Sequence, residues 1–402
     1  MTPEPDRVSS HQSGPAHFAY IDAVRGMAFL GVFAVHAALL VGKFPGQFLL
    51  AEGGYGVQLF FLASAITLSN SMSARRRIDP YPILYFYLRR LFRIAPLFWA
   101  AMIFYWALPR VMPHFWLTEW APNGVHPIYF VLTALFLHGW HPYTFNSIVP
   151  GGWSIAVEMN FYLLFPFLYR FLGRSLRKSV VFVLASIIYI NAINRCLPWL
   201  RHLSFSDISD SVWTFYKSFW LPSQLPVFLI GFLAYHLIRN DSIARLLRVR
   251  FWAGCLLCSC SMVILTVLTG REQGFIPGYL MVVLALAGSI LAISKGSLNW
   301  FVNPAICYLG RISYSCYLVH FAALGITLKL LGLHLTESLP HIDTGHAAGN
   351  VSLFLKITAI ALTLTVAIAT ATLHLIENPG IAMGKKLLSQ ISASRDRQDV
   401  AA

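Results

Sequence analysis

The chain has 402 residues, of which 57% are hydrophobic and only 11% are charged. A soluble domain carries about 25% charged residues, so this composition excludes an ordinary soluble protein and indicates a polytopic membrane protein. The formal net charge of +14 suits basic loops beside anionic lipid, or an anionic substrate, better than nucleic acid.

The polar segments are too short for a second folded domain, so we expect one membrane domain over residues 20–380. Residues 1–19 are rich in Pro and Ser and predict a disordered cytoplasmic tail, and residues 381–402 predict a cytoplasmic C-terminal tail. We expect no cleavable signal peptide before the first apolar stretch. The cysteines and histidines show no metal-ligand spacing, and the cysteines suggest no disulfide framework, so no metal site is expected.

The apolar stretches and basic loops predict an all-α membrane protein with about ten transmembrane helices in one bundle. Because Lys and Arg gather in cytoplasmic loops, the runs at 75–77, 170–178 and 239–250 place the N- and C-termini in the cytoplasm. The expected spans cover about 20–42, 55–72, 84–107, 153–172, 179–197, 213–238, 251–269, 275–294, 303–333 and 351–376.

The apolar residues 127–140 form a stretch that is short for a crossing. A crossing there would also place the basic run 170–178 outside, against the pattern of the other loops. We therefore expect 127–140 to be re-entrant or interfacial, within an outer cap.

The first span contains ionisable side chains, which are costly inside a membrane and usually face the bundle interior. Arg25 and His36 are eleven residues apart, which on an α-helix is about 16 Å of rise and about three full turns. The two side chains therefore share one face, where Asp22 can pair with Arg25. On this helix alone, a structural reading is as well supported as a functional one: Arg25 can snorkel to the membrane interface, and His36 can be a buried histidine with a hydrogen-bond partner.

A carboxylate is expected at the same depth as this histidine. Glu158 lies about five residues from the outer end of its span, and His36 about six residues from the outer end of the first span. A histidine with a carboxylate partner is a usual general base, because the carboxylate orients the ring and stabilises its cation. The structural alternative makes Glu158 a hydrogen-bond hub that ties Trp153 or Tyr162 to another helix.

Four arginines are expected near the inner surface, and they can clamp a phosphorylated ligand arriving from the cytoplasm. The alternative is anchoring to lipid headgroups, which we favour for the run 75–77 and for Arg89. For Arg25 and Arg93, which lie deeper in apolar sequence, we favour a functional role. The four arginines are Arg25, Arg90, Arg93 and Arg311.

Two further ionisable groups lie in the last two spans. His320, near the middle of its span, is a second candidate base or a packing residue with a polar tip, and spacing does not choose between them. Glu377, at the inner end of the last span, is expected to pair with an inner arginine.

These elements together resemble acyltransferase family 3, integral-membrane enzymes that O-acylate bacterial surface sugars and related glycans. The resemblance runs over nearly the whole membrane domain, and its specificity lies in the order of six short elements. They are Arg25 with His36; Phe60, Phe61 and Ser64; Arg90 and Arg93; Trp153, Ser154, Val157, Glu158, Phe161 and Tyr162; the stretch 310–320 with Arg311 and His320; and Glu377 with Pro379. Ala65 and Met159-Asn160 depart from the family pattern, the latter where a second acid and Gln are common.

The resemblance implies an enzyme of the bacterial inner membrane that moves an acyl group, most often acetyl, from cytoplasmic acyl-CoA to a hydroxyl of a cell-surface or exported glycan. Acyl-CoA is then a donor substrate, no cofactor is permanently bound, and the acceptor is a glycan or a lipid-linked sugar. Catalytic roles are implied for Arg25, His36 and Glu158. Substrate contacts are implied for Arg90, Arg93, Trp153, Ser154, Tyr162, Ser64, Arg311 and His320.

Three alternatives stay open at this level. A transient acyl-enzyme would use Ser64 or Ser154, although neither stands in a nucleophile motif. A proton-coupled transporter of an anionic solute would use the arginines as its binding site and His36 as a proton relay, but no internal repeat is evident. A catalytically silent scaffold is the third. Acceptor, acyl chain length and oligomeric state are not fixed by the sequence.

Overall fold

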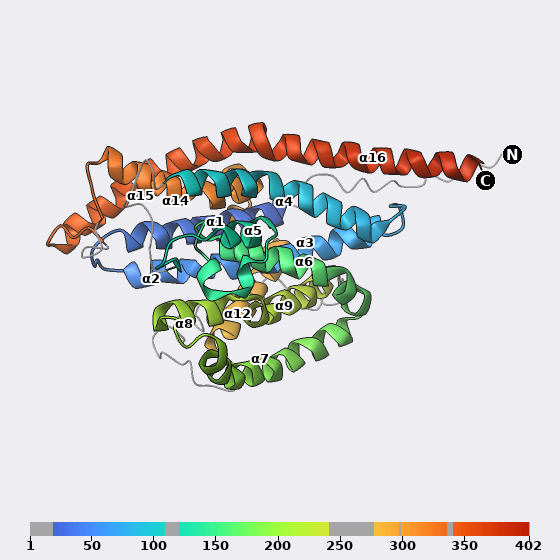
Figure 1. Cartoon of the computed structure of the whole chain (residues 1–402), viewed down its shortest axis with the longest axis horizontal. Helices are drawn as coiled ribbons and strands as arrows, with labels where there is room; N and C mark the ends of the chain where they lie inside the picture. The colour runs from blue at the N-terminus through green and yellow to red at the C-terminus, as the bar shows by residue number, and fades with distance from the viewer. Residues whose placement is uncertain (1–18, 109–119, 241–276, 297–298, 336–340, 402) are drawn as a thin grey trace.

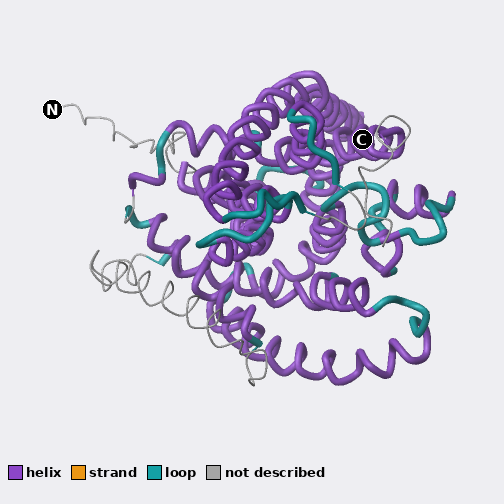
Figure 2. Tube along the Cα trace, turned by 90° about the vertical axis from the view of Figure 1, so that its left-hand side faces the viewer, coloured by secondary structure: helices purple, strands orange, loops and turns teal. Residues whose placement is uncertain are grey.

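The structure is a computed structural model that describes residues 19–108, 120–240, 277–296, 299–335 and 341–401. Across these residues the chain forms helices and loops, and β-structure is limited to an isolated bridge between Val41 and Ile342 (Figure 2). The predicted all-α architecture is therefore confirmed.

Figure 1 shows the helices in chain order, coloured by residue number. The first half contains α1 (Ala19–Leu39), α2 (Gln47–Ala51), η2 (Glu52–Tyr55), α3 (Gly56–Arg75), α4 (Pro82–Ala107), α5 (Pro127–Ala134), η5 (His138–Trp140), η6 (Pro142–Thr144) and α6 (Gly152–Leu172). The second half contains α7 (Leu176–Ser204), α8 (Asp210–Phe219), α9 (Leu221–Arg239), α12 (Gly278–Ser294), η7 (Asn299–Phe301), α13 (Pro304–Arg311), α14 (Ser313–Leu330), α15 (Ala347–Thr372), the π-helical turn η8 (Leu373–Glu377) and α16 (Asn378–Ala401).

Six continuous helical stretches in the described residues are long and apolar enough to cross a membrane, so the predicted count of ten is not confirmed. Three of the predicted spans, at about 84–107, 275–294 and 303–333, are not among these six, and the helices found there show why. The helix α4 contains three arginines, α12 has 17 residues, and the span expected at 303–333 is broken at Ile312 between α13 and α14. The predicted span at 251–269 lies outside the described residues. The six stretches are Ala19–Leu39, Gln47–Arg75, Gly152–Leu172, Leu176–Ser204, Asp210–Arg239 and Ala347–Ser394.

The segment 127–140 does not form a crossing helix. Its helix α5 has eight residues, about 12 Å of rise, and the chain then turns through Phe136, which has a positive φ of 59°. Asn160 of α6 holds this turn, because its side-chain amide donates to the Phe136 carbonyl at 2.8 Å and accepts from Trp140 Nε1 at 3.1 Å. Asn160, one of the departures from the family pattern, thus anchors this segment to α6.

The first helix lies inside the bundle and approaches α13 and η2 at glycines. A Cβ built on Gly310 would lie 1.8 Å from the Asp22 carbonyl oxygen, and one on Gly26 would lie 2.2 Å from the Ile306 carbonyl oxygen. A Cβ on Gly53 would likewise lie 2.2 Å from the Gly31 carbonyl oxygen. Small residues let helix backbones approach closely in membrane proteins, where packing drives association. These contacts fix the position of α1, and with it Arg25.

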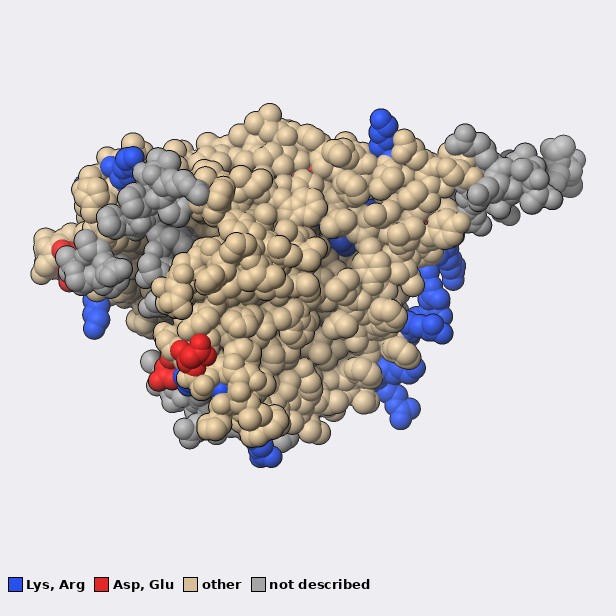
Figure 3. Space-filling model, in the orientation of Figure 1, with Lys and Arg blue, Asp and Glu red and all other residues tan. Residues whose placement is uncertain are grey.

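The basic loops gather at one end of the bundle. Figure 1 places the α3–α4 and α6–α7 turns at the same end, and Figure 3 shows Lys and Arg clustered there. This agrees with the prediction that these loops share one side of a membrane. The exposed basic residues of the two turns are Arg75, Arg76, Arg77, Arg170, Arg174, Arg177 and Lys178.

The last helix, α16, packs along α4. The Tyr85 hydroxyl bonds to the Leu388 carbonyl at 3.1 Å and to Ser392 Oγ at 2.6 Å. A Cβ on Gly384 would lie 2.7 Å from Phe92 Cβ, so this contact is also close. Residues 381–401, expected from the sequence to be a tail, are therefore helical and partly packed against the bundle.

Candidate active site

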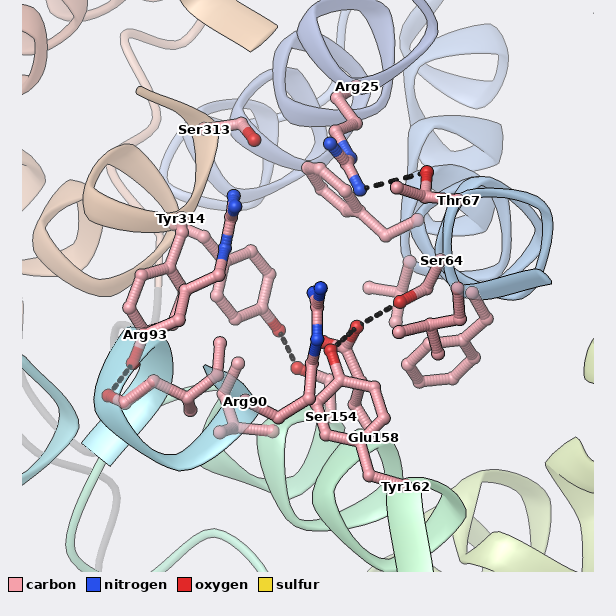
Figure 4. Close-up of a pocket in the computed structure, with 17 residues that line it drawn as sticks. Arg25, Ser64, Thr67, Arg90, Arg93, Ser154, Glu158, Tyr162, Ser313 and Tyr314 are labelled. Carbon is pink, nitrogen blue, oxygen red and sulfur yellow. Dashed lines mark hydrogen bonds between the residues drawn. The ribbon is translucent and has the colours of Figure 1, made fainter. Parts of the chain in front are cut away.

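A polar cavity lies among five helices, α1, α3, α4, α6 and α14 (Figure 4). Its volume of about 70 Å³ has room for a few water molecules or one small polar group. A site for a whole drug-sized ligand measures about 300–1,000 Å³, so this cavity holds one part of a larger substrate. Its polar lining comes from Arg25, Ser64, Thr67, Arg90, Arg93, Ser154, Glu158, Tyr162, Ser313, Tyr314 and Tyr317.

Three guanidinium groups point into this cavity from two helices (Figure 4). Arg25 of α1 donates to Thr67 Oγ1 of α3 at 3.2 Å. Arg90 and Arg93 lie three residues apart on α4 and therefore share a face. The buried Arg90 Nε has no hydrogen-bond partner, and no hydrogen bond or ion pair to Arg93 is found among the described residues. Guanidiniums with free donors in a partly buried site attract an anionic ligand, phosphate above all.

Among the described residues that line the cavity, one carboxylate, Glu158, faces these arginines. Tyr162 donates to Glu158 Oε1 at 2.5 Å, and Ser64 of α3 donates to the same oxygen (Figure 4). Tyr162 lies one turn after Glu158 on α6, so the helix itself aligns this pair. The sequence analysis placed the arginines near the inner surface and Glu158 at the outer depth of His36. The structure places Glu158 in one cavity with Arg25, Arg90 and Arg93, so that predicted separation by depth is wrong.

The wall of the cavity nearest α14 is formed by Tyr317. Its hydroxyl donates to the Gly151 carbonyl at 3.0 Å and lies 2.8 Å from Ser154 Oγ. Gly151 has a φ of 69°, and a Cβ there would lie 2.9 Å from the Tyr317 hydroxyl oxygen, so glycine is needed at this contact. Ser154 is therefore held by a tyrosine, and its side-chain hydrogen bonds within the described residues go to Gly151 and Tyr317 and not to a histidine base.

The two candidate histidines form a pair on the other side of this tyrosine. His36 Nδ1 lies 3.3 Å from His320 Nε2, and the Tyr317 ring packs 5.7 Å from the His320 ring, centroid to centroid. Neither histidine lines the cavity. The expected His36–Glu158 pair is thus not formed, because Glu158 is bound by Ser64 and Tyr162 while His36 is paired with His320.

Two further residues of the predicted site, Trp153 and Arg311, lie outside the cavity, and the predicted pair of Asp22 with Arg25 is not formed. Trp153 packs in an aromatic cluster, with ring centroids 4.7 Å from Phe219 and 5.9 Å from Phe145. Arg311 is exposed, and its guanidinium lies 5.8 Å from the Tyr308 ring centroid. Asp22 forms no ion pair with Arg25 in the described part of the chain.

Four polar lining residues, Thr67, Ser313, Tyr314 and Tyr317, are not among the site residues predicted from the sequence, and for two of them the spacing offered a signal. Thr67 lies three residues after Ser64 on α3, and Tyr317 lies three residues before His320 on α14. Residues three apart share a helix face, so each belongs beside a residue already singled out. Glu377, expected to pair with an arginine, accepts from Ser315 Oγ at 3.0 Å.

The comparisons with known proteins agree with these motifs. Residues 18–370 match the acyltransferase domain of acyltransferase family 3. The chain is also 25% identical to acyltransferase MdmB of Streptomyces mycarofaciens over 387 residues, which are 89% of this chain and 90% of that protein. No solved structure matches the chain. Because the family match covers far more than half of the sequence, the resemblance is confirmed: the chain belongs to acyltransferase family 3 and is a membrane-integral acyltransferase.

Proposed function

We propose that this acyltransferase moves an acyl group, most often acetyl, from cytoplasmic acyl-CoA to a hydroxyl of a cell-surface or exported glycan. The observation that carries the proposal is the cavity in which Arg25, Arg90 and Arg93 face a single carboxylate, Glu158. An excess of half-buried positive charge fits a donor that carries phosphates. The enzyme would work in the bacterial inner membrane, with the donor arriving at the basic end of the bundle.

The arginines hold the donor by its phosphates, and α1 sets the distance to the reacting group. Arg25 and His36 share a face of α1 and are separated by about 16 Å of helix rise. An extended pantetheine arm is of that order, so a phosphate near Arg25 brings the thioester towards His36. The acyl end then lies beyond Tyr317, next to the histidine pair.

His36 is the proposed general base. It removes the proton from the acceptor hydroxyl, and the oxygen attacks the thioester carbonyl carbon. The carbon–sulfur bond breaks, the ester forms, and the proton passes to the departing thiolate to give free CoA. Glu158, which does not contact His36, is assigned to holding hydroxyl groups of the acceptor or of the cavity rather than to orienting the base.

The decisive experiment is acyl transfer from radiolabelled acetyl-CoA to cell-envelope glycan by wild type and His36→Ala at matched membrane expression. The matched control is His334→Ala, since His334 is exposed and lies outside the cavity and the pair. Loss of transfer in His36→Ala alone supports the proposal. Equal transfer by all three removes His36 as the base. Uptake of an anionic solute without any acyl transfer would instead favour a transporter.

A further inference from the structure

The two histidines belong to a short chain of hydrogen bonds that ends on a backbone carbonyl. His320 Nδ1 lies 2.6 Å from the Tyr317 carbonyl oxygen, and its other nitrogen, Nε2, lies 3.3 Å from His36 Nδ1. Phe321 packs on both rings, with centroids 4.5 Å from His36 and 4.1 Å from His320. The geometry of this chain determines where its protons lie.

The first proton is fixed by the carbonyl. A carbonyl oxygen can only accept, so His320 Nδ1 must carry the hydrogen in its bond to Tyr317. The His320 side chain is fully buried, and no carboxylate contacts it in the described residues. Burial without an acidic partner disfavours the imidazolium, so His320 is neutral. Its Nε2 is therefore an unprotonated acceptor.

The second proton follows from the first. Since His320 Nε2 offers a lone pair, His36 Nδ1 must donate to it across the 3.3 Å contact. This contact places the hydrogen of neutral His36 on Nδ1. In neutral His36, Nε2 is then the nitrogen with the free lone pair.

We propose that His320 is a positioning residue that holds His36 in the Nδ1–H tautomer, so that Nε2 is the nitrogen that takes the proton from the acceptor hydroxyl. This rests on the proposed role of His36 as the base. A carboxylate usually orients a catalytic histidine; here a neutral imidazole does so, and it fixes the tautomer and the ring plane without adding a buried charge. Glu158 is then not needed to orient His36, and it keeps its hydrogen bonds to Ser64 and Tyr162 in the cavity.

The test compares two replacements of His320 in the full-length enzyme. His320→Gln can place a carbonyl oxygen where Nε2 stood and keeps an acceptor for His36, whereas His320→Leu removes it. We expect kcat to fall less than about tenfold in the Gln variant and about 100-fold in the Leu variant, within the range for a general base. The KM for acetyl-CoA should be unchanged in both, because the arginines lie in the separate cavity.

A second readout reports the tautomer directly. Nitrogen-15 NMR of protein labelled at the histidine rings, with the His36 signals assigned by their loss in His36→Ala, should show protonated Nδ1 and unprotonated Nε2 in wild type and the Gln variant. The Leu variant should show a mixture of tautomers. Equal elution profiles and melting temperatures in detergent establish that the variants are folded.

Several results would overturn the assignment. A wild-type kcat in His320→Leu together with an inactive His36→Ala would end the positioning role but leave His36 as the base. Protonated Nε2 at His36 in the wild type would contradict the tautomer itself. Equal loss of kcat in the Gln and Leu variants with an unchanged His36 spectrum would also contradict it. An active His36→Ala would remove the base and the catalytic use of the pair.

Discussion

Tyr162 and Ser64 donate hydrogen bonds to one and the same oxygen, Glu158 Oε1, from two different helices. Because either donor can hold the carboxylate when the other is lost, we expect Tyr162→Phe and Ser64→Ala each to lower kcat/KM by about tenfold. The double variant should lose more activation free energy than the two single variants added together, with a coupling free energy of about 0.5–3 kcal/mol. A double-mutant cycle on acyl transfer measures this coupling, and strict additivity would show that the two bonds act separately.

The arginines of the cavity give a prediction about the donor. Arg90 has a buried guanidinium nitrogen without a partner, so a phosphate bonded there gains a charge-assisted bond worth about 1.5–3 kcal/mol. We expect Arg90→Ala to raise the KM for acetyl-CoA by about 10- to 100-fold. Arg90→Lys should recover part of this loss only, because lysine lacks the planar fork.

Arg311 supplies the matched control for that experiment. It is exposed and stacks over Tyr308 outside the cavity, so Arg311→Ala should leave the KM for acetyl-CoA near the wild-type value. A larger effect at Arg311 than at Arg90 would mean that the donor binds outside the cavity, at the exposed surface near Arg311.

The sequence was sufficient for the fold class and for part of the lining of the candidate site. Costly ionisable groups in apolar stretches identified Arg25, Arg93 and Glu158, and all three line one cavity. Helical periodicity also placed Arg25 and His36 on one face of α1. These successes rest on local rules, namely hydropathy and the 3.6-residue repeat.

The pairing of residues between helices was not available from those rules. Depth along a span placed Glu158 beside His36, but rotation about each helix axis decides which side chains meet. The structure turns Glu158 towards Ser64 and gives His36 to His320. Depth also grouped Arg311 with the cavity arginines, although it lies at the end of α13, just before the break at Ile312. A break of this kind has no hydropathy signal.

Trp153 was expected to contact substrate, and the structure predicts a different result for its substitution. The side chain is buried among the rings of Phe145, Phe215 and Phe219 and does not line the cavity. We therefore expect Trp153→Phe to lower the melting temperature while leaving the KM for acetyl-CoA and the KM for the acceptor glycan near their wild-type values. A raised KM with an unchanged melting temperature would restore Trp153 as a binding residue.

The close approach of α1 and α13 links packing to donor binding. A Cβ on Gly310 would lie 1.8 Å from the Asp22 carbonyl oxygen, so Gly310→Ala must push the two helices apart. Overpacking of this kind costs about 1–3 kcal/mol. Since Asp22 precedes Arg25 by one turn of α1, the shift also moves the Arg25 guanidinium away from Thr67, its partner at 3.2 Å.

Gly310→Ala should therefore lower the melting temperature in detergent and raise the KM for acetyl-CoA together. Gly54→Ala is the matched control, because a Cβ there meets no atom within 4 Å and its φ is not positive. If Gly310→Ala lowered stability without changing the KM, the α1–α13 contact would serve folding alone. If neither quantity changed, the backbone contact would not constrain α1, and the position of Arg25 would have to come from its packing against α3.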